Sequence, residues 1–180
     1  MNVITFAGKT PRVDPAAFVA PGVQLIGDIE IGPEASIWYN CVLRGDVNAI
    51  RVGARTNVQD GSVLHVDSPR PGNPSGLPTI IGEEVLIGHM AMVHGCILHD
   101  RAFVGLGAIV MDGCEIEGGG MLAAGALLTP GRRIPAGQLW AGRPAKYVRD
   151  LGEEEIVGQQ AGVAHYVALA RLHAAAVGDG

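Results

Sequence analysis

Aliphatic residues recur every six positions through most of this 180-residue chain, and this period constrains the fold more than any other feature. All eighteen positions hold valine, isoleucine or leucine, although the series is interrupted twice and slips once by a single residue. They are Val19, Leu25, Ile31, Ile37 and Leu43; Val52, Val58 and Leu64; Ile81, Ile87 and Val93; then Leu98, Val104, Val110, Ile116, Leu122, Leu128 and Ile134. An α-helix cannot keep a six-residue step on one face, whereas an even step keeps one face of a strand turned inward. The period therefore predicts an all-β chain of short parallel strands wound into a β-helix.

The corners of such a β-helix need residues that are small or that tolerate positive φ, and the sequence supplies both. Glycine accounts for 27 residues, and it often follows the aliphatic position directly. These hexapeptides resemble the hexapeptide-repeat family, whose fold is a left-handed parallel β-helix with three hexapeptides in each triangular coil. The resemblance implies about six coils, which we expect to form one domain over residues 1–150.

Two segments break the six-residue pattern. Residues 67–79 contain four prolines and two glycines, so we expect them to leave the β-helix as a loop. After Asp150 the repeat stops. Three glutamates at 153–155 then favour a helix N-terminus, and Ile156, Val163, Val167 and Ala170 form a helical stripe. We expect residues 151–180 to form a C-terminal helix that packs on the prism.

Composition excludes several classes of function. A formal net charge of −5 and an aromatic content of 4% argue against a nucleic-acid-binding protein. No apolar run is long enough for a membrane span, so no membrane association is expected. Three cysteines without CxxC spacing, and an N-terminus without a secretory pattern, indicate a reducing, cytoplasmic setting.

Counting hexapeptides at three per coil assigns side chains to faces. Leu43, Leu64 and Val93 then stack on one face, so the residues that follow them, Arg44, His65 and His94, form one column. His89 instead shares the preceding face with Gln59. One chain therefore cannot easily aim all three imidazoles at one point, but a second copy could bring its His89 to the column, three times over in a cyclic trimer. Three imidazoles with an open fourth position are the ligand set of a catalytic zinc ion.

Several sequence blocks resemble the γ-class carbonic anhydrase family. The blocks are Arg44-Gly45-Asp46, Thr56-Asn57-Val58-Gln59-Asp60, Leu64-His65-Val66, Ile87-Gly88-His89, Val93-His94-Gly95-Cys96 and Gly142-Arg143-Pro144-Ala145-Lys146. The resemblance extends over roughly residues 10–172. It implies a homotrimer with a metal at each subunit interface, held by His65 and His94 of one chain and His89 of its neighbour.

The resemblance also implies roles for residues around the metal. Arg44 and Asp46 match a salt-bridge pair, and an ordinary interface ion pair remains an equal alternative. Gln59 matches a residue beside the metal-bound water, and Asp60 matches its acidic neighbour. Asn57 matches a polar residue that lines the site, with a structural corner asparagine as the alternative. Tyr166 resembles a tyrosine that reaches the metal pocket, with helix packing as the alternative.

The implied activity is reversible hydration of CO2 to bicarbonate by a zinc-bound hydroxide, with iron or cobalt as possible substitutes. The alternatives are a hexapeptide-repeat acyltransferase, a metal-dependent hydrolase such as a thioesterase, and a non-catalytic trimeric scaffold. Where the family's best-characterised branch carries proton-relaying glutamates, this chain has Val47 and a loop that holds Asp67 but no glutamate. We therefore expect slow turnover in weak buffer and rescue by concentrated imidazole.

Overall fold

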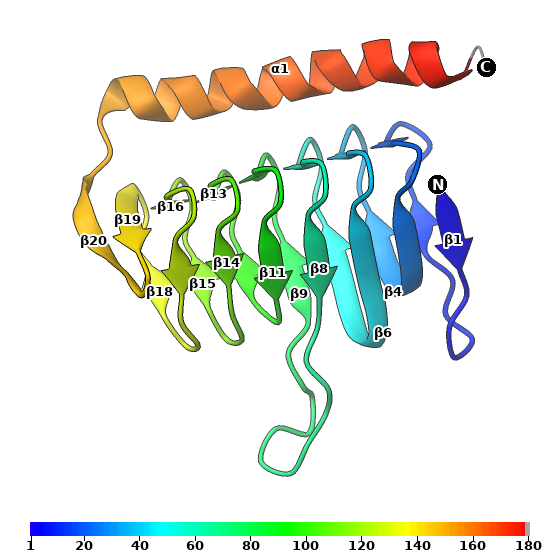
Figure 1. The fold of residues 1–180 in the computed structure, drawn as a ribbon, viewed down its shortest axis with the longest axis horizontal. Coiled ribbons are helices and arrows are strands. Elements are labelled where there is room, and N and C mark those ends of the chain that lie inside the picture. The colour runs from blue at the N-terminus through cyan, green and yellow to red at the C-terminus, as the bar shows by residue number, and fades with distance from the viewer. Residues whose placement is uncertain (179–180) are drawn as a thin grey trace.

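The aliphatic series forms the core of a three-sided β-helix in the computed structural model, which describes residues 1–178 (Figure 1). Seventeen of the eighteen aliphatic side chains are buried, and Val19 is partly buried against the same core. The predicted all-β solenoid with a C-terminal helix is therefore confirmed. Burial of an inward aliphatic in every hexapeptide provides the main driving force for stacking the coils.

One side of the prism, here named the helix face, is an eight-stranded sheet. Its parallel strands come one from each successive coil, and β20 (Ala145–Asp150) closes its end by pairing antiparallel with β19. The parallel strands are β3 (Phe18–Val19), β5 (Ser36–Ile37), β7 (Asn57–Val58), β10 (Leu86–Ile87), β13 (Phe103–Val104), β16 (Met121–Leu122) and β19 (Gln138–Gly142).

The other two sides form one 12-stranded sheet, because β4 (Gln24–Ile31) and β6 (Val42–Val52) continue around a corner. The first side, named the histidine face, contains β1 (Asn2–Ile4), the first parts of β4 and β6, β8 (Val63–His65), β11 (Met92–His94), β14 (Ile109–Val110) and β17 (Leu127–Leu128). The second, named the charged face, contains β2 (Arg12–Val13), the second parts of β4 and β6, β9 (Thr79–Ile81), β12 (Ile97–Leu98), β15 (Glu115–Ile116) and β18 (Arg133–Ile134).

The outward side chains differ sharply between these two sides. The charged face presents one column that is mainly ionic: Arg12, Glu30, Arg51, Ile80, Ile97, Glu115 and Arg133. The histidine face presents an apolar column instead: Val42, Val63, Met92, Ile109 and Leu127. Charged side chains prefer water, so the charged face is suited to solvent, whereas an uncovered apolar column is typical of an interaction surface.

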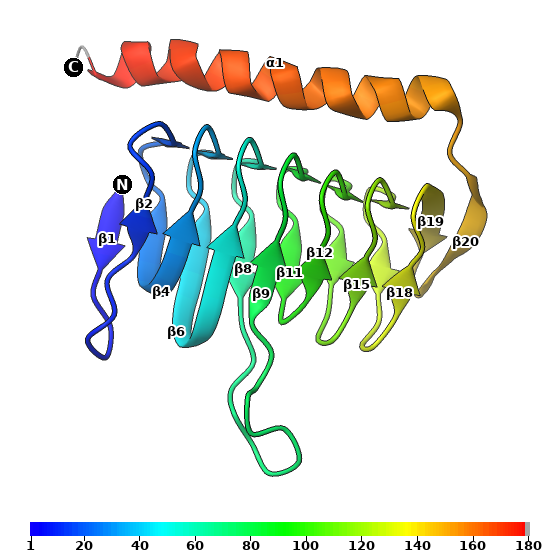
Figure 2. The same cartoon turned by 180° about the vertical axis from the view of Figure 1, so that it is seen from behind.

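The C-terminal helix α1 (Glu153–Gly178) runs along the prism in the direction opposite to coil progression, and its contacts are with the helix face (Figures 1 and 2). Val163 and Ala170 are buried, as the stripe predicts, whereas Ile156 lies on the same side of α1 but is 37% exposed. Gln159 takes the inward position near that end of the helix. The last two residues of the predicted 151–180 segment lie outside the described residues.

Residues 67–78 leave the prism between β8 and β9 as a projecting loop, on the side away from α1 (Figure 1). The loop narrows through backbone bridges between Asp67 and Leu77 and between Arg70 and Asn73. The Asn48 side chain secures its base by donating to the carbonyls of Asp67 and Ser75. Within residues 1–178, no helix combines the length and apolar character needed to cross a bilayer.

Candidate metal centre

His65 and His94 lie side by side at the ends of β8 and β11, because these strands pair in register. His65 Nδ1 is 3.0 Å from His94 Nε2, and the ring centroids are 5.0 Å apart. Arg44 occupies the same column one coil earlier, since Leu43 pairs with Leu64. The structure therefore brings together Arg44, His65 and His94, as the count of hexapeptides predicts.

The other ring nitrogen of each imidazole contacts a carboxylate. His65 Nε2 lies 2.9 Å from Asp46 Oδ1, and His94 Nδ1 lies 2.5 Å from Asp112 Oδ1. An ionised carboxylate only accepts hydrogen bonds, so it favours the tautomer in which that nitrogen carries the proton. The two nitrogens that face each other are then both lone-pair acceptors at 3.0 Å. Such a pair can share a proton or bind a metal ion.

The partners of His65 and His94 show whether these residues fit a metal. Metal-binding histidines nearly always donate their other ring N–H to a carboxylate, carbonyl or water, which fixes the tautomer and the ring orientation. His65 with Asp46 and His94 with Asp112 both satisfy that pattern. Two neutral imidazoles oriented in this way fit a divalent metal that prefers nitrogen ligands.

Asp46 is held by the irregular corner of β6. Arg44 Nη1 pairs with Asp46 Oδ2, and His65 contacts the other carboxylate oxygen. Burial raises the pKa of Asp46, but the hydrogen bonds from His65 and Arg44 outweigh it and hold the pKa below its ordinary value. The corner needs glycine at 45, because a Cβ there would lie 2.5 Å from the carbonyl oxygen of Asp28. Asp46 is therefore a fixed, ionised acceptor.

His89 lies at the corner that follows β10, where the chain leaves the helix face. Its Nδ1 is 2.9 Å from Asp60 Oδ2, and both side chains are 42% exposed. Asp60 follows β7, the strand that pairs with β10, which explains the contact. His89 thus repeats the imidazole–carboxylate pattern of the other two histidines. Within residues 1–178, no three side chains from His, Cys, Asp and Glu gather as a metal-binding group.

Three further predicted residues belong to the helix face. Asn57 is fully buried, Gln59 is nearly so, and Gln59 Nε2 donates to Asn57 Oδ1 at 3.0 Å. Asn57 Nδ2 has no hydrogen-bond partner among the described residues. Tyr166 on α1 packs edge-on against Trp38, with centroids 5.4 Å apart. Burial, and then the negative charge of Asp60, raise the pKa of Tyr166, so its hydroxyl stays protonated.

The predicted site residues therefore fall into two groups in one chain. The first group, on the histidine face, comprises Arg44, Asp46, His65 and His94. The second group, on and beside the helix face, comprises Asn57, Gln59, Asp60, His89 and Tyr166. Their separation follows from the topology, since the first group lies on strands of the 12-stranded sheet and the second lies on or beside the eight-stranded sheet and α1.

Sequence reasoning missed Asp112, the partner of His94. The signal was available, because Val110 lies three hexapeptide steps beyond Val93 and pairs with it in the structure. Asp112, two residues after Val110, therefore lies one coil beyond His94, at the edge of the column formed by His65 and His94. Val47 stands where the family resemblance would place a proton-relaying glutamate, and it is 41% exposed. Asp67, in the projecting loop, is paired with Arg70.

Comparison with known proteins places these features in context. No family model matches the sequence. The chain is 50% identical over 176 residues to "Gamma carbonic anhydrase 2, mitochondrial" of Arabidopsis thaliana, covering 97% of this chain but only 61% of that protein's length. It is 40% identical over 154 residues to "Carbonic anhydrase" of Geobacillus kaustophilus, covering 86% of this chain and 81% of that protein.

A solved structure shares both fold and sequence with this chain. It is described as a hexapeptide transferase family protein from Anaplasma phagocytophilum, with a TM-score of 0.87 and 49% identity. The match covers 94% of this chain and 96% of that one.

Proposed function

The chain belongs to the γ-class carbonic anhydrase family, and from that premise we propose that it catalyses the reversible hydration of CO2 to bicarbonate at a metal site. The observation that carries the proposal is the pair of facing imidazole nitrogens of His65 and His94, each ring anchored on its far side by a carboxylate. Two facing lone pairs repel each other, so this arrangement favours a cation bound by both rings.

Three histidines would hold the metal, with His65 and His94 from one copy and His89 from a second. The His89–Asp60 contact supports the third assignment, because it keeps the proton on Nδ1 and leaves Nε2 as the donor of a lone pair. A divalent ion held by three neutral imidazoles, with zinc as first choice and iron or cobalt as alternatives, supplies Lewis acidity that lowers the pKa of water to near ~7.

The surface of the histidine face supports association of copies. Its apolar column runs beside the column of His65 and His94, and Met92 in the apolar column is 46% exposed. Met90 and Leu106 extend the exposed apolar surface around the corner toward His89, at 70% and 53% exposure. A cyclic trimer would cover this surface in every copy and would set the His89 corner of one copy against the His65–His94 column of the next.

The remaining residues would bind and orient the substrate. Asn57 Nδ2 is a buried donor that has no partner among the described residues, and a CO2 or bicarbonate oxygen that accepted from it would offset the cost of leaving it unpaired. Gln59 holds that amide in place through Asn57 Oδ1. Tyr166, kept neutral by burial, offers a hydroxyl donor from α1. Arg44 fixes Asp46, and Asp46 fixes the His65 ring.

Mixing of inactive variants tests the shared site. His89→Ala and His94→Ala should each lose tight metal binding and CO2 hydration in stopped-flow assays. Unfolding and refolding the two variants together should restore up to one metal and one active site per mixed trimer, because one interface then combines intact His65 and His94 with an intact His89.

The matched control is a mixture of His65→Ala with His94→Ala. It should restore nothing, since both missing residues must come from the same copy. Restoration in this control, with none in the first mixture, would overturn the assignment of ligands to copies. Full metal content in the wild-type protein with no CO2 hydration at any pH would overturn the proposed activity.

A further inference from the structure

An apolar groove of about 340 Å³ runs between α1 and the helix face. Its floor is one outward column of the sheet, formed by Leu86, Phe103 and Met121 in three successive coils. At one end lie Gln59 and Tyr166, two residues of the proposed reaction site. The groove therefore extends the proposed site along the prism.

Two glycines of α1 form the roof of this groove. Gly158 and Gly162 are one turn apart and line it from above. Glycine inside a helix costs about 1 kcal/mol relative to alanine, so each one weakens α1. A Cβ at Gly158 would meet nothing within 4 Å, and one at Gly162 would lie 3.4 Å from Leu86 Cδ1. Local packing therefore does not require glycine at 158, and a side chain there would project beside the groove.

Helix and sheet spacings give the length of the groove. From Gln59 to Met121 it spans three coil spacings of ~4.8 Å, or about 14 Å. Along α1, Tyr166 and Gln159 are seven residues apart, which corresponds to about 10 Å. A ligand with its carbonyl at Tyr166 would therefore reach Gln159 with an extended chain.

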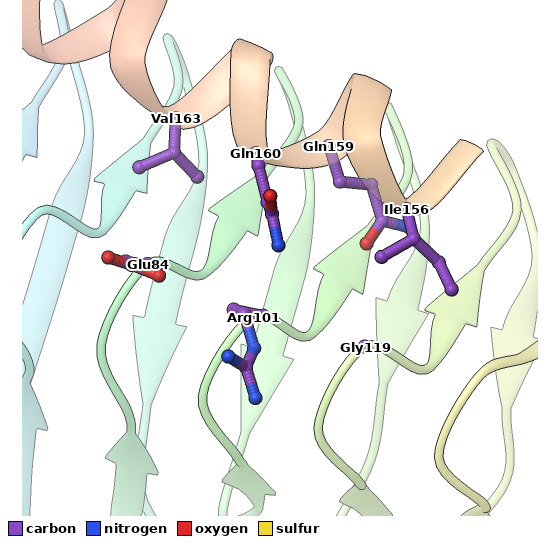
Figure 3. Close-up of a pocket in the computed structure, with 7 residues that line it drawn as sticks. All are labelled: Glu84, Arg101, Gly119, Ile156, Gln159, Gln160 and Val163. Atoms are coloured by element: carbon purple, nitrogen blue, oxygen red, sulfur yellow. The ribbon is translucent and has the colours of Figure 1, made fainter. Parts of the chain in front are cut away.

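Gln159 supplies an independent sign of a ligand. Its side chain reaches from α1 toward the prism and lines both this groove and a smaller pocket on the other flank of the helix (Figure 3). The residue is only 9% exposed, and its Nε2 has no hydrogen-bond partner among the described residues. A buried donor left unpaired costs about 1–3 kcal/mol, which an acceptor on a bound molecule would recover.

An ion pair lies at the far end of the groove. Glu155 lines the groove beside Gln159, and its carboxylate is held by Arg149 through two contacts of 2.6 and 2.8 Å. This ion pair carries no net charge, and a neutral amide or ester carbonyl could accept from Gln159.

We propose that this groove binds the acyl chain of an ester or thioester, with the reacting carbonyl at Gln59 and Tyr166 and a neutral carbonyl acceptor about 10 Å along the chain at Gln159. The inference rests on the proposed function, because the same site would supply the water. The water oxygen bonds to the acyl carbon, the bond from that carbon to the alcohol oxygen or thiol sulfur breaks, and the leaving group takes up a proton. The products are a carboxylic acid and an alcohol or thiol.

Hydrolysis and binding assays on the full-length protein supplied with zinc test this inference. The substrates are p-nitrophenyl acetate and p-nitrophenyl 6-acetamidohexanoate, and the binding probe is 6-acetamidohexanamide, measured by calorimetry. We expect kcat/KM for the amide-bearing ester to exceed that for the acetate by about tenfold. Gly158→Leu and Met121→Trp should remove this preference and weaken binding of the probe at least tenfold. Ala161→Leu, on the exposed side of α1, should retain both.

The outcomes separate this inference from the proposed function. CO2 hydration without probe binding or chain preference would overturn the groove and leave the carbonic anhydrase proposal standing. Probe binding that Gly158→Leu abolishes, in a protein that hydrates no CO2, would support the groove and overturn the proposed function. Probe binding unchanged in both Gly158→Leu and Met121→Trp would also overturn the groove.

Discussion

At the scale of single residues, the geometry of the site depends on the carboxylates behind the histidines as much as on the histidines. Asp46, Asp60 and Asp112 each contact one ring nitrogen and so determine which nitrogen is left for a metal. Asp112 is the residue that a list of expected ligands would omit, although its contact with His94 is the shortest of the three.

Asp112→Asn should reduce metal affinity by about 10- to 100-fold, because the neutral amide holds the His94 N–H less strongly and the ring loses its orientation. Competition with a chelator measures the effect. Asp100→Asn is the matched control, since Asp100 lies on another corner and accepts from the backbone N–H of Glu83. Equal affinity in the two variants would show that the His94–Asp112 contact is an ordinary surface ion pair.

At the scale of elements, α1 begins with a charged clamp. Arg149 of β20 holds Glu155, and the backbone N–H of Gly152 donates to Glu155 Oε2 at 3.0 Å. The hydrogen bond from Arg149, followed by that from Gly152, lowers the pKa of Glu155 to about 2. A lowered pKa in the folded state means that the clamp stabilises at pH values above the ordinary value of 4.5 and is lost as pH falls toward about 2.

Glu155→Gln should therefore lower the melting temperature at pH 7, and its difference from the wild type should shrink as pH falls from 4.5 to 2. Thermal unfolding followed by circular dichroism across this range measures the change. Glu154→Gln, in the same exposed helical turn, should have little effect at any pH. A Glu155→Gln difference that persists unchanged at pH 2 would show that the clamp stabilises through packing and not through charge.

At the scale of the whole molecule, the three sides of the prism differ in what covers them. The helix face is covered by α1, the charged face suits solvent, and the histidine face is left with an apolar column. The candidate site lies where that uncovered face meets the His89 corner. In the proposed trimer, a neighbouring copy would complete it.

Met92→Lys should convert the proposed trimer to a monomer, because the trimer would bury the lysine in the apolar column without a partner. Sedimentation and metal analysis on the same sample should show the loss of both trimer and metal. Ile97→Lys places the same charge on the charged face, where the register neighbour Glu115 is acidic, and should stay trimeric. A Met92→Lys trimer with full metal content would exclude the histidine face as the interface.

The sequence alone determined the repeat, the buried core and the column of Arg44, His65 and His94, because a six-residue period maps directly onto strands and coils. It also separated His89 from the other two histidines. Only the tertiary structure decided which ring nitrogen each carboxylate contacts, since the hexapeptide count places Asp112 near His94 but does not orient the side chains. It also decided that Gln159 is buried more deeply than Ile156, although both line the small pocket under α1, because packing against the prism, rather than hydropathy, sets how far each side chain is covered.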